Sequence, residues 1–253
     1  MDRELIAQAA EIIRKARAGI AFTGAGVSTP SGIPDFRSPE SGIWNNVDPM
    51  EVASAPGFTR NPQAFYNWIH PLASLARSAV PNPAHHTLAS WERQGFLNGI
   101  ITQNIDGLHT AAGSRTVYEL HGHLRDAVCQ KCGRVVPTAP LMDRFMTDRL
   151  VPRCEQCGGV MKPSVVLFGD ELPRSALDNA YRAAERADVM IVVGSSLEVA
   201  PANDLPRVAL RNGAALIIVN LQQTHLDRNA RVAIHDDAAV VLPAIADRIE
   251  KSA

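Results

Sequence analysis

Short apolar runs and longer amphipathic stretches alternate along this chain. Residues 5–16 carry apolar side chains at helical spacing, with Asp2 as a suitable N-cap before them and Gly19 after them, so a helix is predicted there. Nearly continuous apolar runs instead predict buried strands, and a shorter, weaker run predicts one more strand at residues 240–242. The stronger strand predictions are residues 20–23, 100–102, 189–193 and 215–219.

Helical patterns separate these predicted strands. They cover residues 85–93, 175–186 and 204–211, and a final helix carries Ile245 and Ile249. Strands that are apolar throughout and alternate with helices are typical of a parallel sheet covered by helices on both faces. The pattern therefore predicts an α/β fold.

Two segments break this alternation. Residues 34–80 are rich in proline, asparagine and serine, whereas residues 124–163 carry all four cysteines. We interpret both segments as insertions into the α/β unit, so the large domain is discontinuous in sequence. Its predicted parts are residues 1–33, 81–123 and 164–253.

Composition narrows the class of protein. A chain of 253 residues with 46% hydrophobic residues can form one large core and a small satellite domain. The net charge of -1 and the pI near 6.7 lack the basic excess of a nucleic-acid-binding protein. No apolar run reaches the ~18 residues of a membrane span, and the amino end lacks the apolar core of a signal peptide. We therefore expect a cytoplasmic protein that binds neither nucleic acid nor a membrane.

The cysteines form two Cys-x-x-Cys pairs. The pairs are separated by 21 residues, 133–153, which is close to the spacing of a zinc ribbon. Disulfides are the alternative, but thiols stay reduced in the cytoplasm. Four thiolates would close the coordination shell of one tetrahedral Zn²⁺, so the predicted metal is structural. The predicted ligands are Cys129, Cys132, Cys154 and Cys157.

Glycine and small polar residues follow three of the predicted strands. The turn after residues 20–23 brings backbone N–H groups within reach of a pyrophosphate at the start of a helix, although a tight turn without a ligand explains that turn alone equally well. Asn220 closes the strand at 215–219, where dinucleotide-binding sheets place a ribose ligand. Three such strand ends in one parallel sheet predict a dinucleotide crevice. Its other members are Gly24, Ala25, Gly26, Ser28, Gly194, Ser195 and Ser196.

A polar cluster follows the strand at 100–102. Asn104 and Asp106 are poor strand formers and costly to bury, so their place at a strand end predicts a chemical site. His121 lies just before the cysteine-bearing segment, and a neutral imidazole can act as a base near neutral pH. A capping, packing or solvated role is the favoured interpretation of His85, His86, His109, His123, His225 and His235.

Residues 32–38 form a proline-bearing loop that contains Phe36 and Arg37. The arginine can reach a phosphate or a carboxylate. From this segment alone, a surface loop with an exposed arginine is the favoured interpretation.

In their order and spacing, these motifs resemble those of the sirtuins, the silent-information-regulator family of NAD-dependent protein lysine deacylases. The similarity covers nearly the whole chain. It implies a Rossmann-like NAD-binding domain, a helical and cofactor-loop insertion at 34–80, and a zinc-ribbon insertion at 124–163. Apart from the cysteines, the matching segments are residues 24–28, 32–37, 102–106, 120–122, 166–169, 194–196 and 219–221.

NAD is the co-substrate that the resemblance implies. Phe36 and Arg37 would lie on a mobile cofactor-binding loop, and Asp106 would face the carboxamide of nicotinamide. The other residues that the resemblance assigns to NAD are Ala25, Thr29, Gln103, Ile105, Gly194, Ser195, Asn220, Leu221 and Ala238.

The implied reaction removes an acyl group from a lysine of a protein or peptide. The acyl oxygen would attack C1′ of the nicotinamide ribose as nicotinamide leaves. His121 would then deprotonate a ribose hydroxyl, which attacks the imidate carbon, and Asn104 would position ribose and water. The products would be free lysine, nicotinamide and O-acyl-ADP-ribose. Val166, Phe168 and Gly169 would flank the acyl-lysine, whose peptide backbone pairs as an added strand.

The chain departs from the family pattern at two places. Asp170 stands where the family more often has glutamate, so the charge is kept on a shorter side chain. Family members that remove succinyl or malonyl groups carry a Tyr-x-x-Arg pair, whereas Tyr66 is followed at that spacing by Ile69. An apolar side chain cannot pair with a carboxylate, so we predict neutral acyl groups, acetyl first and longer aliphatic chains after it.

Other functions are weaker interpretations. A protein mono-ADP-ribosyltransferase uses the same NAD, but relatives specialised for that reaction tend to lose the histidine found here at His121. An NAD-sensing or scaffold module would leave the cluster of Asn104, Asp106 and His121 unexplained. A dehydrogenase has no use for a zinc ribbon in its hydride-transfer site, and Asn220 replaces its acidic ribose ligand.

Overall fold

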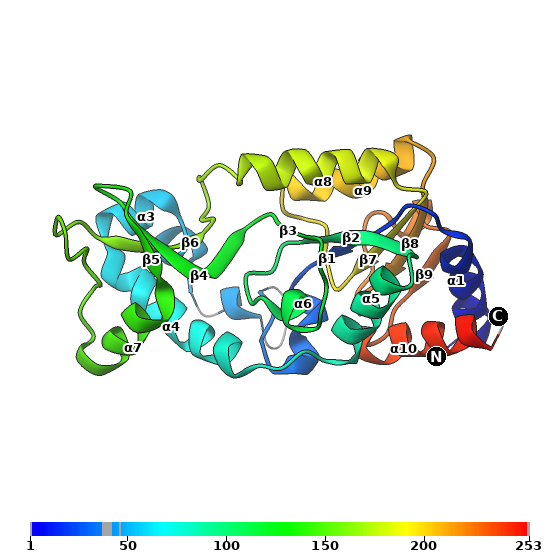
Figure 1. Ribbon diagram of the computed structural model, residues 1–253, viewed down its shortest axis with the longest axis horizontal. Helices are drawn as coiled ribbons and strands as arrows, with labels where there is room; N and C mark the ends of the chain where they lie inside the picture. The colour runs from blue at the N-terminus through cyan, green and yellow to red at the C-terminus, as the bar shows by residue number, and fades with distance from the viewer. Residues whose placement is uncertain (1, 37–41, 46, 252–253) are drawn as a thin grey trace.

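A computed structural model of the chain describes residues 2–36, 42–45 and 47–251. They form an elongated molecule with a large parallel sheet at one end and a small antiparallel sheet at the other (Figure 1). None of the helices in this part of the chain combines the length and the apolarity that a membrane crossing requires.

The first strand of the chain lies at the centre of the large sheet, and later strands are added on both sides of it. Its order, β3-β2-β1-β7-β8-β9 over the described residues, is that of a Rossmann-type sheet with all neighbours parallel. A sheet of this order binds ligands at the carboxyl ends of its two central strands, here β1 and β7. The strands are β1 (Gly19–Thr23), β2 (Leu97–Thr102), β3 (Val117–Glu119), β7 (Val189–Val193), β8 (Ala215–Val219) and β9 (Val232–Ile234).

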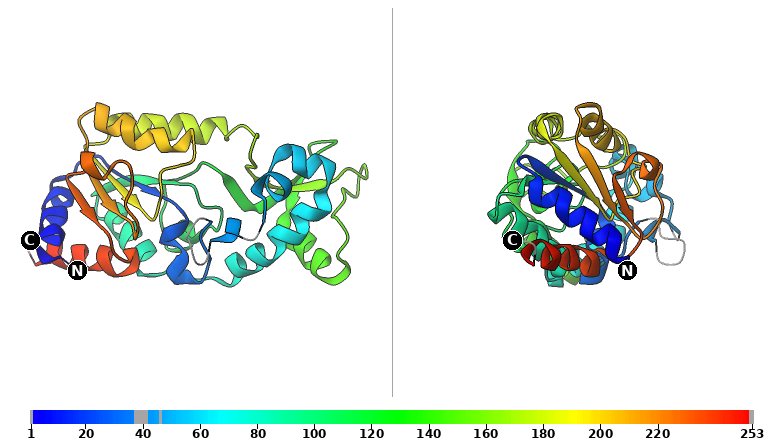
Figure 2. Two further views of the ribbon diagram at one scale, coloured as in Figure 1. Left: turned by 180° about the vertical axis from the view of Figure 1, so that it is seen from behind. Right: turned by 90° about the vertical axis from the view of Figure 1, so that its right-hand side faces the viewer.

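Helices cover both faces of this sheet, as the end-on view in Figure 2 shows. Successive strand residues point to opposite faces, so Ala21 and Ile191 join one buried cluster while Phe22 and Met190 join the other. The first face is covered by α1 (Arg3–Lys15), α5 (Pro83–Arg93) and α10 (Ala238–Glu250), and the second by α8 (Arg174–Arg186) and α9 (Leu205–Arg211). The predicted α/β class with a doubly covered parallel sheet is confirmed.

A smaller unit forms around the second sheet. Its strand β4 lies between β5 and β6, and both neighbours are antiparallel to it. The core beside this sheet is aromatic: Phe65, Tyr66 and Phe145 are fully buried, and the Tyr66 hydroxyl donates to the Met161 carbonyl oxygen at 2.8 Å. The elements are α2 (Pro49–Val52), α3 (Ala55–Arg60), α4 (Pro62–Ser78), β4 (Gly122–Cys129), β5 (Val135–Pro137), α7 (Thr138–Asp148) and β6 (Met161–Val165). The two segments predicted as insertions therefore share one core, although they are far apart in sequence. The predicted domain boundaries themselves stay a prediction.

The strand predicted at residues 240–242 is wrong, because these residues belong to helix α10. Asp237 caps that helix by accepting from the Ala239 N–H at 2.8 Å, and Val241 and Ile245 are buried four residues apart. Three consecutive apolar residues do not distinguish a strand from a buried helix turn.

The sequence pattern also missed two short edge strands, β3 and β9, and the form of the turn after β1. That strand leads into 3₁₀ turns and not into an α-helix. Pro30 has no N–H to donate, which disfavours a longer helix at this point. The short helical elements are η1 (Ala25–Val27), η2 (Thr29–Ser31), η3 (Ile43–Asn45), α6 (Leu108–Ala111), η4 (Ala202–Asp204) and η5 (Asp227–Asn229).

Candidate active site

A cavity of about 430 Å³ opens at the carboxyl ends of the central strands and extends to the small unit. Its size is that of a typical cofactor or small-molecule site. Every residue predicted from the sequence to bind NAD, to flank the substrate or to take part in catalysis lines this cavity, with one exception. The exception is Arg37, which lies outside the described residues.

The wall of the cavity beside β1 and β7 is made of backbone. A Cβ atom on Gly26 would lie 2.8 Å from the Cα of Gly194, and one on Gly194 would lie 2.2 Å from the Val27 nitrogen. Gly194 also has a φ of 60°, a conformation that favours glycine. The ends of β1 and β7 can therefore approach each other this closely only because Gly26 and Gly194 have no side chains. The exposed backbone leaves room for a pyrophosphate to bind close to it.

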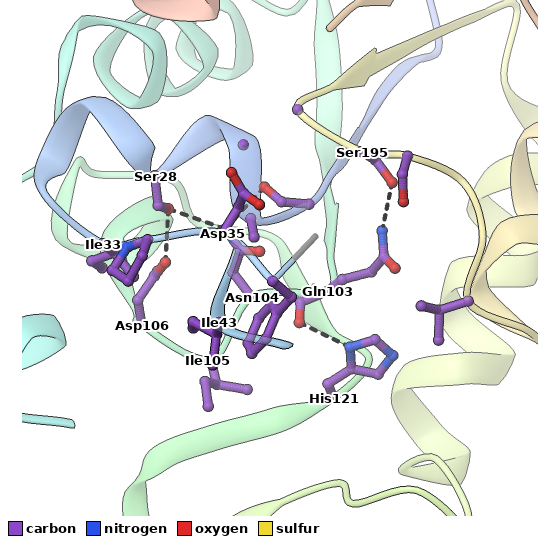
Figure 3. A pocket seen from close by; sticks show the side chains of 18 of the residues that line it. Ser28, Ile33, Asp35, Ile43, Gln103, Asn104, Ile105, Asp106, His121 and Ser195 are labelled. Atoms are coloured by element: carbon purple, nitrogen blue, oxygen red, sulfur yellow. Dashed lines mark hydrogen bonds between the residues drawn. The ribbon is translucent and has the colours of Figure 1, made fainter. Parts of the chain in front are cut away.

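A hydrogen-bonded trio forms the floor of the cavity. The Ser28 hydroxyl donates to Asp106 Oδ2 at 2.7 Å and accepts from Asn104 Nδ2 at 3.0 Å. Figure 3 shows Ser28 and Asp106 turned toward each other, with Asn104 beside them. The trio brings together side chains from the turn after β1 and from the loop after β2, as the strand-end argument predicted.

The environment of Asp106 raises its pKa above the usual value. Burial is the larger cause, because it penalises the charged carboxylate. Hydrogen bonds from the Leu108 N–H and from Ser28 act against burial and favour the carboxylate. Its two oxygens thus have partners within the protein, which fixes the orientation of this carboxyl group in the cavity wall.

His121 is held in one tautomer by the backbone. Its Nδ1 lies 2.9 Å from the Gln103 carbonyl oxygen, and a carbonyl can only accept, so Nδ1 carries the proton of the neutral ring. The lone pair is then on Nε2, which makes that atom the basic position. Gln103 in turn donates from Nε2 to the Ser195 hydroxyl at 2.9 Å and so ties the loop after β2 to the loop after β7 (Figure 3).

Two further histidines lie beneath the trio, and the sequence analysis assigned neither to the site. His85 and His109 are buried with ring centroids 4.8 Å apart. His85 Nε2 lies 3.5 Å from the Ser28 hydroxyl, and His109 Nε2 lies 2.9 Å from the Thr23 hydroxyl. Burial lowers the pKa of His85 to about 4 and that of His109 to about 3, so both rings are neutral at pH 7.

Protonation of these histidines should make stability depend on pH. A histidine with an ordinary pKa of 6.5 when unfolded and a lowered pKa when folded binds more protons in the unfolded state. The free energy of unfolding is therefore expected to be highest above about pH 7 and to fall as the pH drops from 6.5 toward 4. Each histidine contributes a slope of up to ~1.4 kcal/mol per pH unit.

Urea unfolding at pH 7, 6 and 5 measures this slope. The variant His109→Phe removes one titrating group. Whatever its stability at pH 7, its free energy of unfolding should therefore change less steeply with pH than that of wild type, by up to ~1.4 kcal/mol per pH unit. Equal slopes for the two proteins would contradict the assignment of His109 as a buried neutral group.

Two tryptophans from the first inserted segment, Trp44 and Trp68, complete the cavity, and neither was predicted from the sequence to line it. The Trp44 ring lies 5.5 Å from Trp68 and 6.2 Å from Phe168, and all three line the cavity. Ile33 and Asp35 line it too, so the surface-loop interpretation of residues 32–38 is wrong for this part of the loop. The concentration of tryptophan in residues 34–80 was the available signal.

The four cysteines form a zinc-binding site. All four Sγ atoms lie within 4.8 Å of one another, with Cys129 and Cys157 at 3.4 Å and Cys132 and Cys154 at 3.8 Å. Four sulfurs bonded at ~2.3 Å to a tetrahedral zinc would lie ~3.8 Å apart, so the arrangement fits the ion. A disulfide requires ~2.05 Å, and all four thiols are free. The structure thus brings the four predicted zinc ligands together in one cluster.

Comparison with known proteins identifies the family. A model of the Sir2 family matches residues 24–201, which is more than half of the chain. The chain belongs to the Sir2 family. The resemblance to the sirtuins noted from the motifs is thus confirmed.

Individual Sir2 relatives match over almost their entire length. A protein of Caldanaerobacter subterraneus, named NAD-dependent protein deacetylase 2, is 44% identical over 95% of this chain and 94% of its own. A solved Sir2 enzyme superposes with a TM-score of 0.94 at 43% identity, covering 100% of both chains. Another Sir2 structure, solved with a deacetylated p53 peptide and 3′-O-acetyl ADP-ribose, gives a TM-score of 0.90 at 36% identity, covering 94% of this chain and 96% of that one.

Proposed function

We propose that this Sir2 protein is an NAD-dependent protein lysine deacylase that produces nicotinamide, O-acyl-ADP-ribose and free lysine. The observation that carries the proposal is the position of His121. Its Nε2 is the basic atom of a ring fixed by the Gln103 carbonyl, and it lines the same cavity as the Asn104–Ser28–Asp106 trio and the bare backbone beside β1 and β7. Relatives of nearly full length carry the names and bound molecules of this activity.

NAD would lie across the crevice. The backbone wall formed by Gly26 and Gly194 would bind the pyrophosphate of NAD. Asp106 would bind the nicotinamide carboxamide, because the hydrogen bonds from Ser28 and Leu108 hold its carboxyl group in place. The adenosine half would contact Asn220, which directly follows β8, and Ala238, the first residue of α10. When bound, NAD supplies an electrophilic ribose carbon and nicotinamide as the leaving group.

The protein's own residues would supply orientation and proton transfer. Asn104 donates to the Gly24 carbonyl at 3.2 Å and to Ser28, so its amide is held where it can position the ribose and a water. His121 would accept a proton at Nε2 from a ribose hydroxyl. Its Nδ1 proton stays with the Gln103 carbonyl, which keeps the ring oriented during the transfer.

The acyl-lysine would enter beside the loop that follows β6. The Val166 N–H donates to the His121 carbonyl at 2.9 Å, so this loop is attached directly to the residue that carries the base. Phe168, 37% exposed, and Gly169 lie at the rim of the cavity. A peptide pairing with this loop would place its acyl-lysine next to His121.

Incubation with NAD and an acetyl-lysine peptide tests the proposal. Mass detection should show equal amounts of deacetylated peptide, nicotinamide and O-acetyl-ADP-ribose. Transfer of label from NAD onto protein, without O-acetyl-ADP-ribose, would instead indicate a mono-ADP-ribosyltransferase. NAD binding without nicotinamide release would indicate a sensing module.

Neutral acyl groups should be preferred. Ile69 is 1% exposed and lines the cavity, and the Tyr66 hydroxyl is committed to the Met161 carbonyl in the core. No lysine or arginine is present among the described residues of the cavity wall, so a succinyl carboxylate has no partner there. We expect kcat/KM for an acetyl-peptide to exceed that for the matched succinyl-peptide by at least ~10-fold. The reverse order would contradict this prediction.

Two further parts of the proposal concern location and organisation. We place the protein in the cytoplasm, where four zinc-binding thiols stay reduced. We also propose the NAD-binding domain at 1–33, 81–123 and 164–253, with the two insertions forming the smaller unit.

A further inference from the structure

We propose that Lys162 is a positioning residue for the acyl-lysine, acting through Asp170. The two side chains form an ion pair, the Lys162–Asp170 clasp, that fixes the loop at residues 165–170 against strand β6. The proposal rests on the proposed function, because it assigns this loop a peptide to hold. It assigns a role to Lys162, which lies outside the predicted site, and to Asp170, which had none.

The first half of the clasp is the ammonium group of Lys162. Lys162 lies within β6, and its Nζ is 2.7 Å from Asp170 Oδ2. The same Nζ donates to the Val165 carbonyl at 2.9 Å, where β6 ends and the loop begins. The side chains are only 14% and 28% exposed, so the pair is largely shielded from water and stronger than a surface pair.

The second half is the turn closed by Asp170. Its Oδ2 accepts from the Leu167 N–H at 3.0 Å, while its own N–H donates to the Leu167 carbonyl at 2.9 Å. Gly169 between them has a φ of 92°, which a side chain would disfavour. One carboxylate oxygen thus joins the turn to Lys162, and through Lys162 the turn is joined to β6.

Backbone hydrogen bonds hold the earlier part of the loop independently. Val166 donates to the His121 carbonyl, Phe168 donates to the Ala53 carbonyl at 2.9 Å, and Ala55 donates to the Phe168 carbonyl at 2.9 Å. These bonds do not involve Lys162. Breaking the clasp should therefore leave the loop attached at Val166 and Phe168, while Gly169 and Asp170, which line the cavity, become mobile.

The opposite charges of Lys162 and Asp170 also mean that neither side chain can be removed without leaving the other charge unpaired. Asp170 is part of the cavity wall, and its carboxylate is neutralised there by Lys162. Removing the ammonium leaves a shielded carboxylate that must turn toward water, and removing the carboxylate leaves a shielded ammonium. Either change should move the turn away from the position in which it borders the acyl-lysine.

Steady-state kinetics with NAD and an acetyl-lysine peptide test the clasp. Lys162→Met and Asp170→Asn should each raise KM for the peptide by about 10-fold. KM for NAD and kcat should change less than about 3-fold, because Gly26, Gly194 and His121 are untouched. The double variant should be no worse than either single one, and Lys162→Arg, which keeps the charge, should stay close to wild type.

The matched control is Lys15→Met. Lys15 pairs with Glu11 at 2.8 Å on the surface of α1, with side chains 68% and 48% exposed, so its loss should leave all constants unchanged. Equal effects of Lys162→Met on kcat, on KM for NAD and on KM for the peptide would overturn the proposal, as would no effect at all.

Hydrogen exchange gives a readout that does not require turnover. The amides of Leu167 and Asp170 should exchange faster in Lys162→Met and Asp170→Asn than in wild type, while those of Val166 and Phe168 and the large sheet keep their protection. Unchanged exchange in this loop would overturn the clasp. If the wild type turned over no acyl-peptide, the proposed function would fail, and the exchange comparison would still decide whether Lys162 orders the loop.

Discussion

Replacing His121 by alanine is expected to lower NAD-dependent deacylation by about 10²- to 10⁴-fold, the usual effect of losing a general base. His121 is the one histidine among the described residues that line the cavity, so no second imidazole is in place to accept the proton. The loss should be seen in kcat at saturating NAD and acetyl-peptide. Zinc content and the circular dichroism spectrum should match wild type, because alanine keeps the backbone hydrogen bond between the Val166 N–H and the carbonyl of residue 121 and leaves the cysteine ligands unchanged.

His86→Ala is the matched control. His86 is exposed on α5, next to the buried His85, and it does not line the cavity. Its removal should leave turnover within about 2-fold of wild type, the small effect of most surface substitutions. Near-normal turnover in His121→Ala would remove the basis of the mechanism.

Loss of the metal is the second change with a large expected effect. Cys154→Ser should reduce the zinc content from one equivalent to near zero, and residues 124–163 should lose their protection from hydrogen exchange. Zinc contributes ~10–16 kcal/mol to the folding of zinc-finger peptides, which is comparable with the whole stability of an ordinary domain. The buried cluster around Cys129 and Met161 is small and has few other contacts to replace the metal.

Deacylation should fall with the zinc, although the metal is no part of the chemistry. Strand β4 carries Cys129 at its end and begins at Gly122, directly after His121, so disorder in the zinc site is transmitted along one strand to the base. The large sheet has two cores of its own and should remain protected. Lys131→Ser, an exposed position inside the first knuckle, is the control. A Cys154→Ser protein that keeps one zinc and full protection would contradict this account.

Periodicity predicted the large sheet well for a physical reason. Its central strands are buried on both faces, so nearly all of their positions are apolar, and such runs are visible in sequence. β3 and β9 were missed because they are three residues long, and residues 240–242 were misassigned because a three-residue run has no measurable period.

The site was predictable where chemistry is concentrated and not where it depends on packing. Asn104, Asp106 and His121 are costly to bury and stand out at strand ends. His85 and His109 are separated by 24 positions, and only the contact of α5 with α6 brings their rings together. The pairing of Lys162 with Asp170 likewise had no signal in the sequence, because an ion pair depends on the path of the loop between its two residues.

The shared aromatic core of the two inserted segments limits how this enzyme can be divided. Each segment leaves the large sheet and returns to it, so the chain passes between the two halves four times. No single continuous fragment contains either half. Because the Val166 N–H is bonded to the His121 carbonyl, any opening or closing of the crevice should carry His121 and the loop at 165–170 as a single body.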